Sequence, residues 1–179
     1  AGAAAVAIAR SLLSSHNKEA VAALQKVAEA AKGKDAGRLA QDALALASLG
    51  ANIAPQGKAS SPDGLDSDGG ASGDQAAIDG NPETYWDEAD GKPLYRLVVT
   101  FPQPRRFNAI SILGYVQHSY APKDFDILAD GKVVREVRNA QYANNFLVLT
   151  FPETTAKVLE LKITGYYGNS PAIRDLGVY

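Results

Sequence analysis

A short segment near the middle of the chain, residues 76–86, gathers oxygen-bearing side chains around a turn. Gly80 tolerates a positive φ, and Pro82 keeps the residue before it out of the helical region, so the pattern predicts a tight turn. Such a turn places backbone carbonyls beside the Asp79 carboxylate and the Thr84 hydroxyl. Mixed hard oxygens are the ligands that Ca²⁺ prefers. A surface turn that leads into a strand, with the tryptophan that ends the segment in the core, explains the same spacing without a cation.

Composition limits the classes of function that the chain can have. Its 179 residues are 46% hydrophobic and 21% charged, which is ordinary for a globular protein. The net charge is −2 and no basic block occurs, so we expect no nucleic-acid partner. No apolar run is long enough to cross a bilayer, so we expect no membrane insertion. Cysteine is absent, which excludes disulfides. Methionine is also absent, even at position 1, so we expect a piece of a longer chain with flanking domains.

Residues 1–50 have a helical pattern. Three short helices are predicted: one before Ser14, one capped by Asn17 and stopped by Gly33, and one capped by Asp35 and ended by Gly50. Their faces consist of Ala, Val and Leu, which is typical of units from a helical repeat array. We therefore assign residues 1–50 to a small all-α segment that resembles helical repeats.

From residue 51 onward the hydrophobic period changes to two. Asp130-Gly131 between two such runs indicates a two-residue hairpin. Residues 60–75 contain almost nothing that can be buried, so they are expected to form a surface loop. Seven or eight short strands imply an antiparallel β-sandwich over residues 51–179. The principal predicted strands are Tyr95 to Phe101, Phe107 to Val116, Lys123 to Ala129, Val133 to Val137, Asn145 to Phe151, Lys157 to Gly165 and Ile173 to Tyr179.

Three segments together resemble the discoidin family, the coagulation-factor type C domains. They are Asn52-Ile53-Ala54, the segment from Ala76 to Trp86, and the closing run from Ser170 to Tyr179. The resemblance implies that the sandwich is of the jelly-roll type and begins with a strand near Asn52. The family includes a large bacterial branch of galactose-binding-like carbohydrate-binding modules, so a glycan or polysaccharide partner is expected.

The resemblance also implies a structural Ca²⁺ ion that joins the segment around Asp79 to the last strand. The family more often has Glu where Asp175 stands, so one ligand is a methylene shorter here. The implied ligands are the carbonyls of Ala76, Asn81, Thr84 and Arg174, the hydroxyl of Thr84, and the carboxylates of Asp79 and Asp175.

A sugar site combines an aromatic face with polar groups that hold hydroxyls. Galactose-binding members carry Tyr-Val-Pro-Arg where this chain has Tyr115-Val116-Gln117-His118, so a galactose preference is not implied. We expect the predicted loops to meet at one end of the sandwich, although such a residue, taken singly, is more often an ordinary solvated loop residue than a ligand contact. The candidates are Asp87, Glu88, His118, Tyr120, Tyr166, Tyr167 and Asn169.

Catalysis finds little support in the sequence. There is no nucleophile elbow and no phosphate-cradling glycine loop, and the two histidines, His16 and His118, are not at ligand spacing. Asp87 and Glu88 are adjacent, so on an extended chain they point to opposite faces rather than forming a glycosidase pair. We therefore expect a non-catalytic glycan-recognition module with structural calcium, from a larger secreted bacterial protein in the extracellular space or the periplasm. The alternative is a structural or protein-interaction module that orients neighbouring domains.

Overall fold

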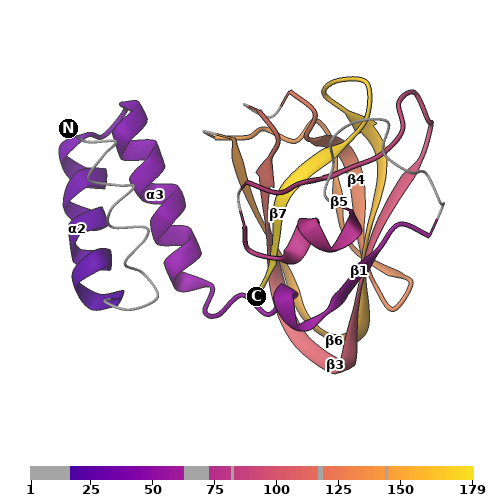
Figure 1. The fold of residues 1–179 in the computed structure, drawn as a ribbon. Helices are drawn as coiled ribbons and strands as arrows, with labels where there is room; N and C mark the ends of the chain where they lie inside the picture. Colours follow the sequence, from indigo (N-terminus) through magenta and orange to yellow (C-terminus); the bar gives the residue numbers. More distant parts are fainter. Residues whose placement is uncertain (1–16, 63–72, 82, 117–118, 144) are drawn as a thin grey trace. The chain divides into compact units, whose positions relative to one another are not determined.

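The computed structural model describes residues 17–62, 73–81, 83–116, 119–143 and 145–179. Contacts divide the chain into two compact units, Ala1–Gly50 and Ala51–Tyr179. The first is helical and the second is built almost entirely of strands (Figure 1).

Two helices make up the described part of the first unit, α2 (Asn17–Ala30) and α3 (Asp35–Ser48). Gly33 has a φ of +77° after the end of α2, so its lack of a Cβ permits the left-handed turn that ends the helix. Of the side chains that the structure describes here, the fully buried apolar ones between α2 and α3 are Leu24, Ala40 and Ala43. The helix predicted before Ser14 lies outside the described residues. None of the helices that the structure describes is long and apolar enough to span a membrane.

The second unit is a sheet of antiparallel strands in the order β2-β7-β3-β6-β4-β5, with β1 paired to β3. This confirms the predicted mainly-β antiparallel jelly-roll sandwich, except that the stretch after Asn52 is a short 3-10 helix rather than a strand. Its elements are η1 (Ala54–Gln56), β1 (Lys58–Ser60), η2 (Asp74–Ile78), β2 (Trp86–Asp87), β3 (Tyr95–Gly114), β4 (Pro122–Ala129), β5 (Lys132–Val137), β6 (Phe146–Tyr166) and β7 (Ala172–Val178).

Two long bent strands hold the sandwich together. β3 and β6 each run through what the sequence predicts to be two separate strands, and they pair with one another on both sides of a bend. The pairing register shifts between Thr100 and Arg105, where Pro102 and Pro104 cannot donate to a ladder. Proline is tolerated there because the ladder is already interrupted. The interruption lets each strand bend without ending. Figure 1 shows both bends at the end of the sandwich where β3 and β6 are labelled.

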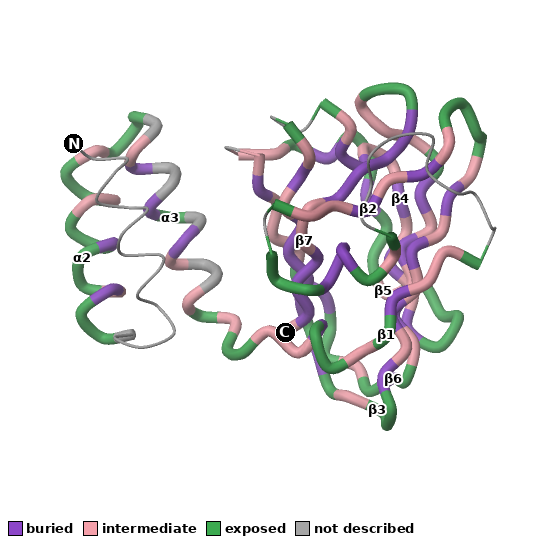
Figure 2. The backbone as a smooth tube through the Cα atoms, viewed as in Figure 1, coloured by how far each residue is buried: buried purple, intermediate pink, exposed green. Residues whose placement is uncertain are grey.

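The core follows from the period-two pattern of these strands. Tyr95, Leu97, Val99 and Phe101 are fully buried, and the residues between them are only half-buried (Figure 2). Trp86 is 1% exposed, so its predicted place in the core is confirmed. Burial of such large side chains contributes about 1.5–3 kcal/mol each, which makes them the main source of stability.

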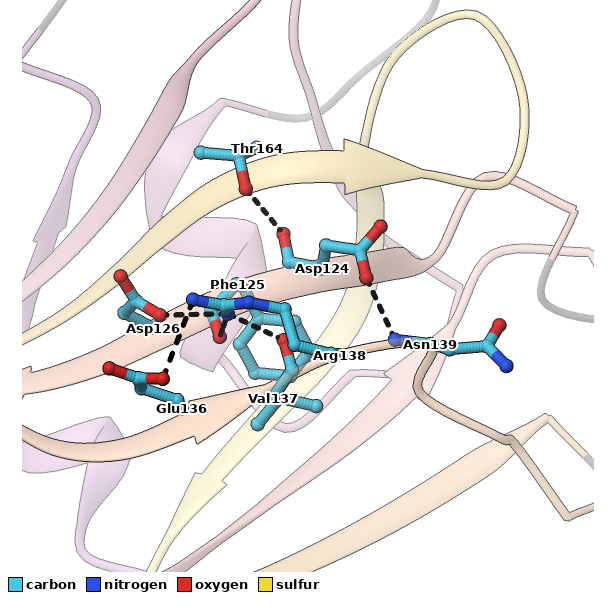
Figure 3. Close-up of polar contacts among 8 residues, drawn as sticks. All are labelled: Asp124, Phe125, Asp126, Glu136, Val137, Arg138, Asn139 and Thr164. Atoms are coloured by element: carbon cyan, nitrogen blue, oxygen red, sulfur yellow. Dashed lines mark hydrogen bonds and ion pairs between the residues drawn. The ribbon is translucent and has the colours of Figure 1, made fainter.

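The predicted hairpin at Asp130-Gly131 joins β4 and β5, with φ angles of +46° and +77° as a type I′ turn requires. Just beyond β5, Arg138 donates to the carbonyls of Phe125 (3.1 Å) and Val137 (2.8 Å) and pairs with Asp126 at 2.8 Å (Figure 3). The hydrogen bond from Arg138 to Asp126 raises the pKa of the guanidinium. These contacts fix the start of the loop that follows β5.

The loop predicted over residues 60–75 lies mostly outside the described residues. At its two ends, Ser61 donates from both its backbone nitrogen (3.0 Å) and its hydroxyl (2.9 Å) to the carboxylate of Asp74. The Ala59 nitrogen donates to Gln75 Oε1 at 3.0 Å. These contacts bring β1 and η2 together, so the segment that leads into the turn at Asp79 begins from a fixed position.

Candidate functional site

The turn at Asp79 brings predicted cation ligands together. Thr84 Oγ1 lies 2.8 Å from Asp79 Oδ2, 3.0 Å from Asp79 Oδ1 and 2.8 Å from the Asn81 carbonyl oxygen. The Asn81 nitrogen donates to Asp79 Oδ1 at 2.8 Å, and Gly80 has the positive φ, +73°, that the turn needs. We call Asp79, Gly80, Asn81 and Thr84 the Asp79 loop.

The last strand lies beside this loop. β2 pairs antiparallel with β7, with Trp86 opposite Ile173; Thr84 lies two residues before Trp86, and Asp175 lies two residues after Ile173. The Oδ1 atom of Asp175 is buried. Ala76 in η2 is also buried, at 3% exposure. Segments about ninety residues apart in the chain are therefore neighbours in the way a shared cation requires.

The donor set of this region suits a hard cation. All its groups are oxygens, from carboxylates, a hydroxyl and carbonyls, which is the chemistry that Ca²⁺ prefers over softer metals. Within the described ranges no three acidic or histidine side chains gather, so carbonyl oxygens would have to supply much of the shell. The residues that would hold the ion are those predicted from the sequence, and their role stays a prediction: Ala76, Asp79, Asn81, Thr84, Arg174 and Asp175.

Three loops that carry sugar-binding candidates meet at one end of the sandwich (Figure 1). Backbone hydrogen bonds join them directly: Gly91 nitrogen to Asn169 oxygen (2.9 Å), Ala172 nitrogen to Tyr120 oxygen (2.8 Å) and Tyr167 nitrogen to Ala121 oxygen (3.1 Å). We call this region, formed by residues 88–94, 119–121 and 166–171, the loop end.

At the loop end, the backbone after β6 can approach Ser119 and Tyr120 closely because Gly168 has no Cβ atom. A Cβ atom at Gly168 would lie 2.7 Å from both the Ser119 carbonyl oxygen and the Tyr120 ring. The Tyr120 ring therefore packs directly against the backbone of the loop after β6. Gly168 and Asn169 are exposed and Tyr120 is half-buried, so the ring borders a stretch of exposed backbone.

The two adjacent tyrosines of the loop end face different neighbours. The Tyr166 hydroxyl donates to the Lys92 carbonyl at 3.2 Å, and its ring meets Tyr95 edge to face at 5.4 Å between centroids. The Tyr167 hydroxyl donates to the Ala140 carbonyl at 2.7 Å. Because their contacts are with different loops, Tyr166 and Tyr167 do not form one flat platform.

The carboxylates of Asp87 and Glu88 are engaged inside the sandwich. Glu88 is 3% exposed, and its Oε1 accepts a hydrogen bond from the Trp86 indole at 2.9 Å. Asp87 Oδ1 accepts from the Ser170 hydroxyl at 3.0 Å and from the Glu88 nitrogen at 2.9 Å. The burial of Glu88 does not suit the ligand contact expected of it, because a ligand hydroxyl outside the sandwich cannot reach its carboxylate. His118 lies outside the described residues.

Sequence reasoning missed a row of aromatic rings between the two candidate sites. The ring centroids of Tyr85 and Tyr115 are 4.5 Å apart, and those of Tyr115 and Tyr120 are 5.8 Å apart. The Arg174 guanidinium lies 5.4 Å from the Tyr115 centroid. No spacing in the sequence indicates this row, because Tyr85 and Arg174 come from distant segments that the β2-β7-β3 pairing brings beside Tyr115.

Comparison with solved structures supports the fold. Chitosan-binding module 1 of a Paenibacillus sp. IK-5 chitosanase/glucanase is 19% identical, with a TM-score of 0.61 over 72% of this chain and 97% of that one. A family 32 carbohydrate-binding module from Clostridium perfringens, in complex with galactose, is 22% identical, with a TM-score of 0.60 over 71% and 96%. A putative α-L-fucosidase from Bacteroides thetaiotaomicron is 19% identical, with a TM-score of 0.62 over 80% and 31%.

The search of curated proteins finds no match. The family model of the F5/8 type C domain matches residues 56–175, which is well over half of the chain and includes both the Asp79 loop and the loop end. The chain therefore belongs to the F5/8 type C domain family.

Proposed function

We propose that residues 51–179 form a non-catalytic glycan-binding module whose binding surface is the loop end. The observation that carries the proposal is that three loops, distant in sequence, are joined there by backbone hydrogen bonds around Tyr120. Loops held by a rigid scaffold are where binding residues concentrate. The family resemblance that the sequence predicted points to the same class of ligand.

The chemistry of the loop end suits a sugar. The Tyr120 ring offers an aromatic face for the C–H side of a pyranose, beside the exposed amide of Asn169. The side chains of Ser119, Asp90 and Lys92 are also exposed and supply a hydroxyl, an acid and an amine for sugar hydroxyls. The carboxylates of the two adjacent acids after Trp86 are engaged internally, which argues against a glycoside-cleaving pair at this end.

Related structures supply the ligands with which the proposal can be tested. They include complexes with galactose, with GalNAc-β-1,3-galactose and with chitotriose. One longer relative, the putative fucosidase, is matched over only 31% of its length, which supports an accessory role in a larger protein. We extend the proposal to a secreted bacterial parent, located outside the cell or in the periplasm, and to a structural Ca²⁺ ion in the Asp79 loop.

Calorimetric titration of the chain with these three sugars, at 1 mM CaCl₂, tests the proposal. An open site of this size should bind one of them with a dissociation constant on the order of 0.1–1 mM. Tyr120→Ala should reduce binding at least about tenfold without a large change in melting temperature, because a half-buried loop ring contributes little to the core. Tyr179→Ala, at the end of β7, is the matched control and should bind as the wild type does.

Two results would count against the proposal. Equal affinity of the wild type and Tyr120→Ala would place binding elsewhere on the sandwich. Absence of binding to all three sugars, and to a wider glycan array, would favour the alternative of a structural or protein-interaction module.

A further inference from the structure

One aromatic ring touches both segments of the predicted cation site and the proposed sugar surface. Tyr115 lies against Tyr85 (4.5 Å) and Tyr120 (5.8 Å) and under the guanidinium of Arg174 (5.4 Å). Tyr85 directly follows Thr84, and Arg174 directly precedes Asp175. The ring therefore contacts the immediate neighbours of two predicted cation ligands that come from opposite parts of the chain.

The strand register explains this arrangement. Trp86 pairs with Ile173, and both are buried, so the residues one step along each strand, Tyr85 and Arg174, lie opposite one another on the other face. Thr84 directly precedes Tyr85, and Asp175 directly follows Arg174, so each of these predicted ligands is bonded to a residue that contacts the Tyr115 ring. A backbone adjustment that fits the oxygens of Thr84 and Asp175 around a cation would therefore move the residues that hold Tyr115.

The segment that follows Tyr115 is held in an uncommon conformation. Val116 has a φ of +30° and is 51% exposed, so its backbone geometry is not one that a β-branched residue adopts freely. Its carbonyl accepts hydrogen bonds from the Ser119 nitrogen (3.1 Å) and hydroxyl (2.7 Å). Tyr115 and Tyr120 therefore each lie directly beside one partner of the hydrogen-bonded contact between Val116 and Ser119.

We propose that Tyr115 transmits cation occupancy of the Asp79 loop to Tyr120, and so acts as a positioning residue for the glycan surface. When Asp79, Thr84 and Asp175 share a Ca²⁺ ion, the adjoining Tyr85 and Arg174 are fixed and clamp the Tyr115 ring. Tyr120 then rests in the orientation that a sugar ring requires. The sugar part rests on the proposed function, whereas the link from cation to Tyr120 can be measured without any sugar.

The first experiment uses Ca²⁺ alone. The chain is labelled with 3-fluorotyrosine at its eight tyrosines, and the ¹⁹F line of Tyr120 is identified by its loss in Tyr120→Phe. Fluorescence of the single tryptophan, Trp86, reports cation binding beside the Asp79 loop. In the wild type, the Tyr120 line should shift with added CaCl₂ at the same midpoint as the fluorescence change.

The variants distinguish a loss of coupling between the cation and Tyr120 from a loss of folding. Tyr115→Leu should keep the Trp86 response and lose the Tyr120 shift, whereas Tyr115→Phe keeps the ring and should keep both. Tyr179→Leu is the matched control on the same sheet and should keep both. If circular dichroism shows that Tyr115→Leu does not fold, Arg174→Gln removes one contact of the ring and should reduce the Tyr120 shift at least twofold.

Two outcomes overturn the proposal. One is that neither the Trp86 fluorescence nor the melting temperature changes with CaCl₂, because then there is no cation binding that could be coupled to Tyr120. The other is a Tyr120 shift that is equally large in Tyr115→Leu, or that is absent from the wild type while the fluorescence changes.

A second arm adds chitotriose to the same proteins. Calcium should raise the affinity of the wild type at least about fivefold and leave that of Tyr115→Leu unchanged, and chitotriose should raise the calcium affinity by the same factor. If calcium raised the affinity for chitotriose by the same factor in the wild type and in Tyr115→Leu, the sugar part of the inference would be overturned. Absence of sugar binding together with a Tyr115-dependent shift would contradict the proposed function while supporting the coupling.

Discussion

Oxygen atoms crowd around Thr84 more closely than one hydroxyl can satisfy. Its single proton faces both carboxylate oxygens of Asp79 and the carbonyl oxygen of Asn81, all within 3.0 Å. A hydroxyl donates one hydrogen bond at a time, and the Asn81 nitrogen donates to Asp79 Oδ1, so the Thr84 proton serves only one of the remaining oxygens of this turn at a time. A cation among these oxygens would give the others a positive partner.

The corresponding prediction concerns Asp79. Excess EDTA should lower the melting temperature, and CaCl₂ at about a hundred times its dissociation constant should restore about 2.7 kcal/mol of stability. Asp79→Ala should melt lower and lose the response to calcium. Differential scanning calorimetry measures both effects.

Glu83→Gln is the matched control for Asp79→Ala. It removes an exposed acid from the same segment that is not among the predicted ligands, so it should respond to calcium as the wild type does. Identical melting curves of the wild type in EDTA and in CaCl₂ would contradict a dissociable cation site.

At the scale of the elements, one buried side chain anchors a whole loop of the loop end. The Tyr95 hydroxyl, at the start of β3, donates to the Ala89 carbonyl and accepts from the Lys92 nitrogen, each at 2.8 Å. Two bonds from one fully buried residue fix the segment between β2 and β3. Without them this loop would lose its position beside the loop after β6.

Tyr95→Phe should therefore reduce stability by about 1–3 kcal/mol, since the buried partners lose their bonds. Burial raises the pKa of Tyr95 to about 12 from the ordinary 10.0. Because the folded-state pKa is the higher one, this contribution is complete below pH 10 and is lost as the pH rises from 10 to about 12. Urea unfolding across this range should show a shallower alkaline loss for Tyr95→Phe. Equal losses in both proteins would assign the alkaline effect to other residues.

Local signals determine which elements the sequence could predict. The β4–β5 hairpin was predictable because Asp130-Gly131 favours one turn type, and β7 was predictable from the family resemblance of the closing run. The continuity of β3 and β6 was not, since Pro102 and Pro104 normally end a strand and only the paired bend keeps them within one.

The residues of the candidate site also differ in how far the sequence could predict their positions. Period two already implies that Tyr166 and Tyr167 point apart, as the structure shows. The burial of Glu88 was not predictable, because its Oε1 shares the Trp86 indole with the Ser61 hydroxyl, which comes from a distant segment. No local signal indicates the contacts of the Tyr115 ring with Tyr85 and Arg174, because those residues come from distant segments of the chain.

For the whole molecule, the two units differ greatly in the core that each can bury. Among the residues whose side chains the structure describes, the fully buried apolar ones between α2 and α3 are one leucine and two alanines. The second unit buries a tryptophan, several phenylalanines and many aliphatic residues in one cluster. Small cores rarely support independent folding, whereas a domain of the second unit's size normally folds alone.

We predict that residues 51–179 alone melt cooperatively and that residues 1–50 alone show weak helicity. Far-UV circular dichroism during heating measures both fragments. A cooperative melt of residues 1–50 would show that the helices need no partner.

Mapping of amide shifts tests the central claim, that the loop end binds glycan, most directly. The ¹⁵N-labelled chain is titrated, with CaCl₂ present, with the tightest of galactose, GalNAc-β-1,3-galactose and chitotriose. The account predicts that the largest shifts fall on the amides of Gly91, Tyr120, Gly168 and Asn169, which neighbour one another across the three loops. Largest shifts at the opposite end, in residues 102–106 and 152–155 of the β3 and β6 bends, would contradict it, as would the absence of any shift at saturating sugar.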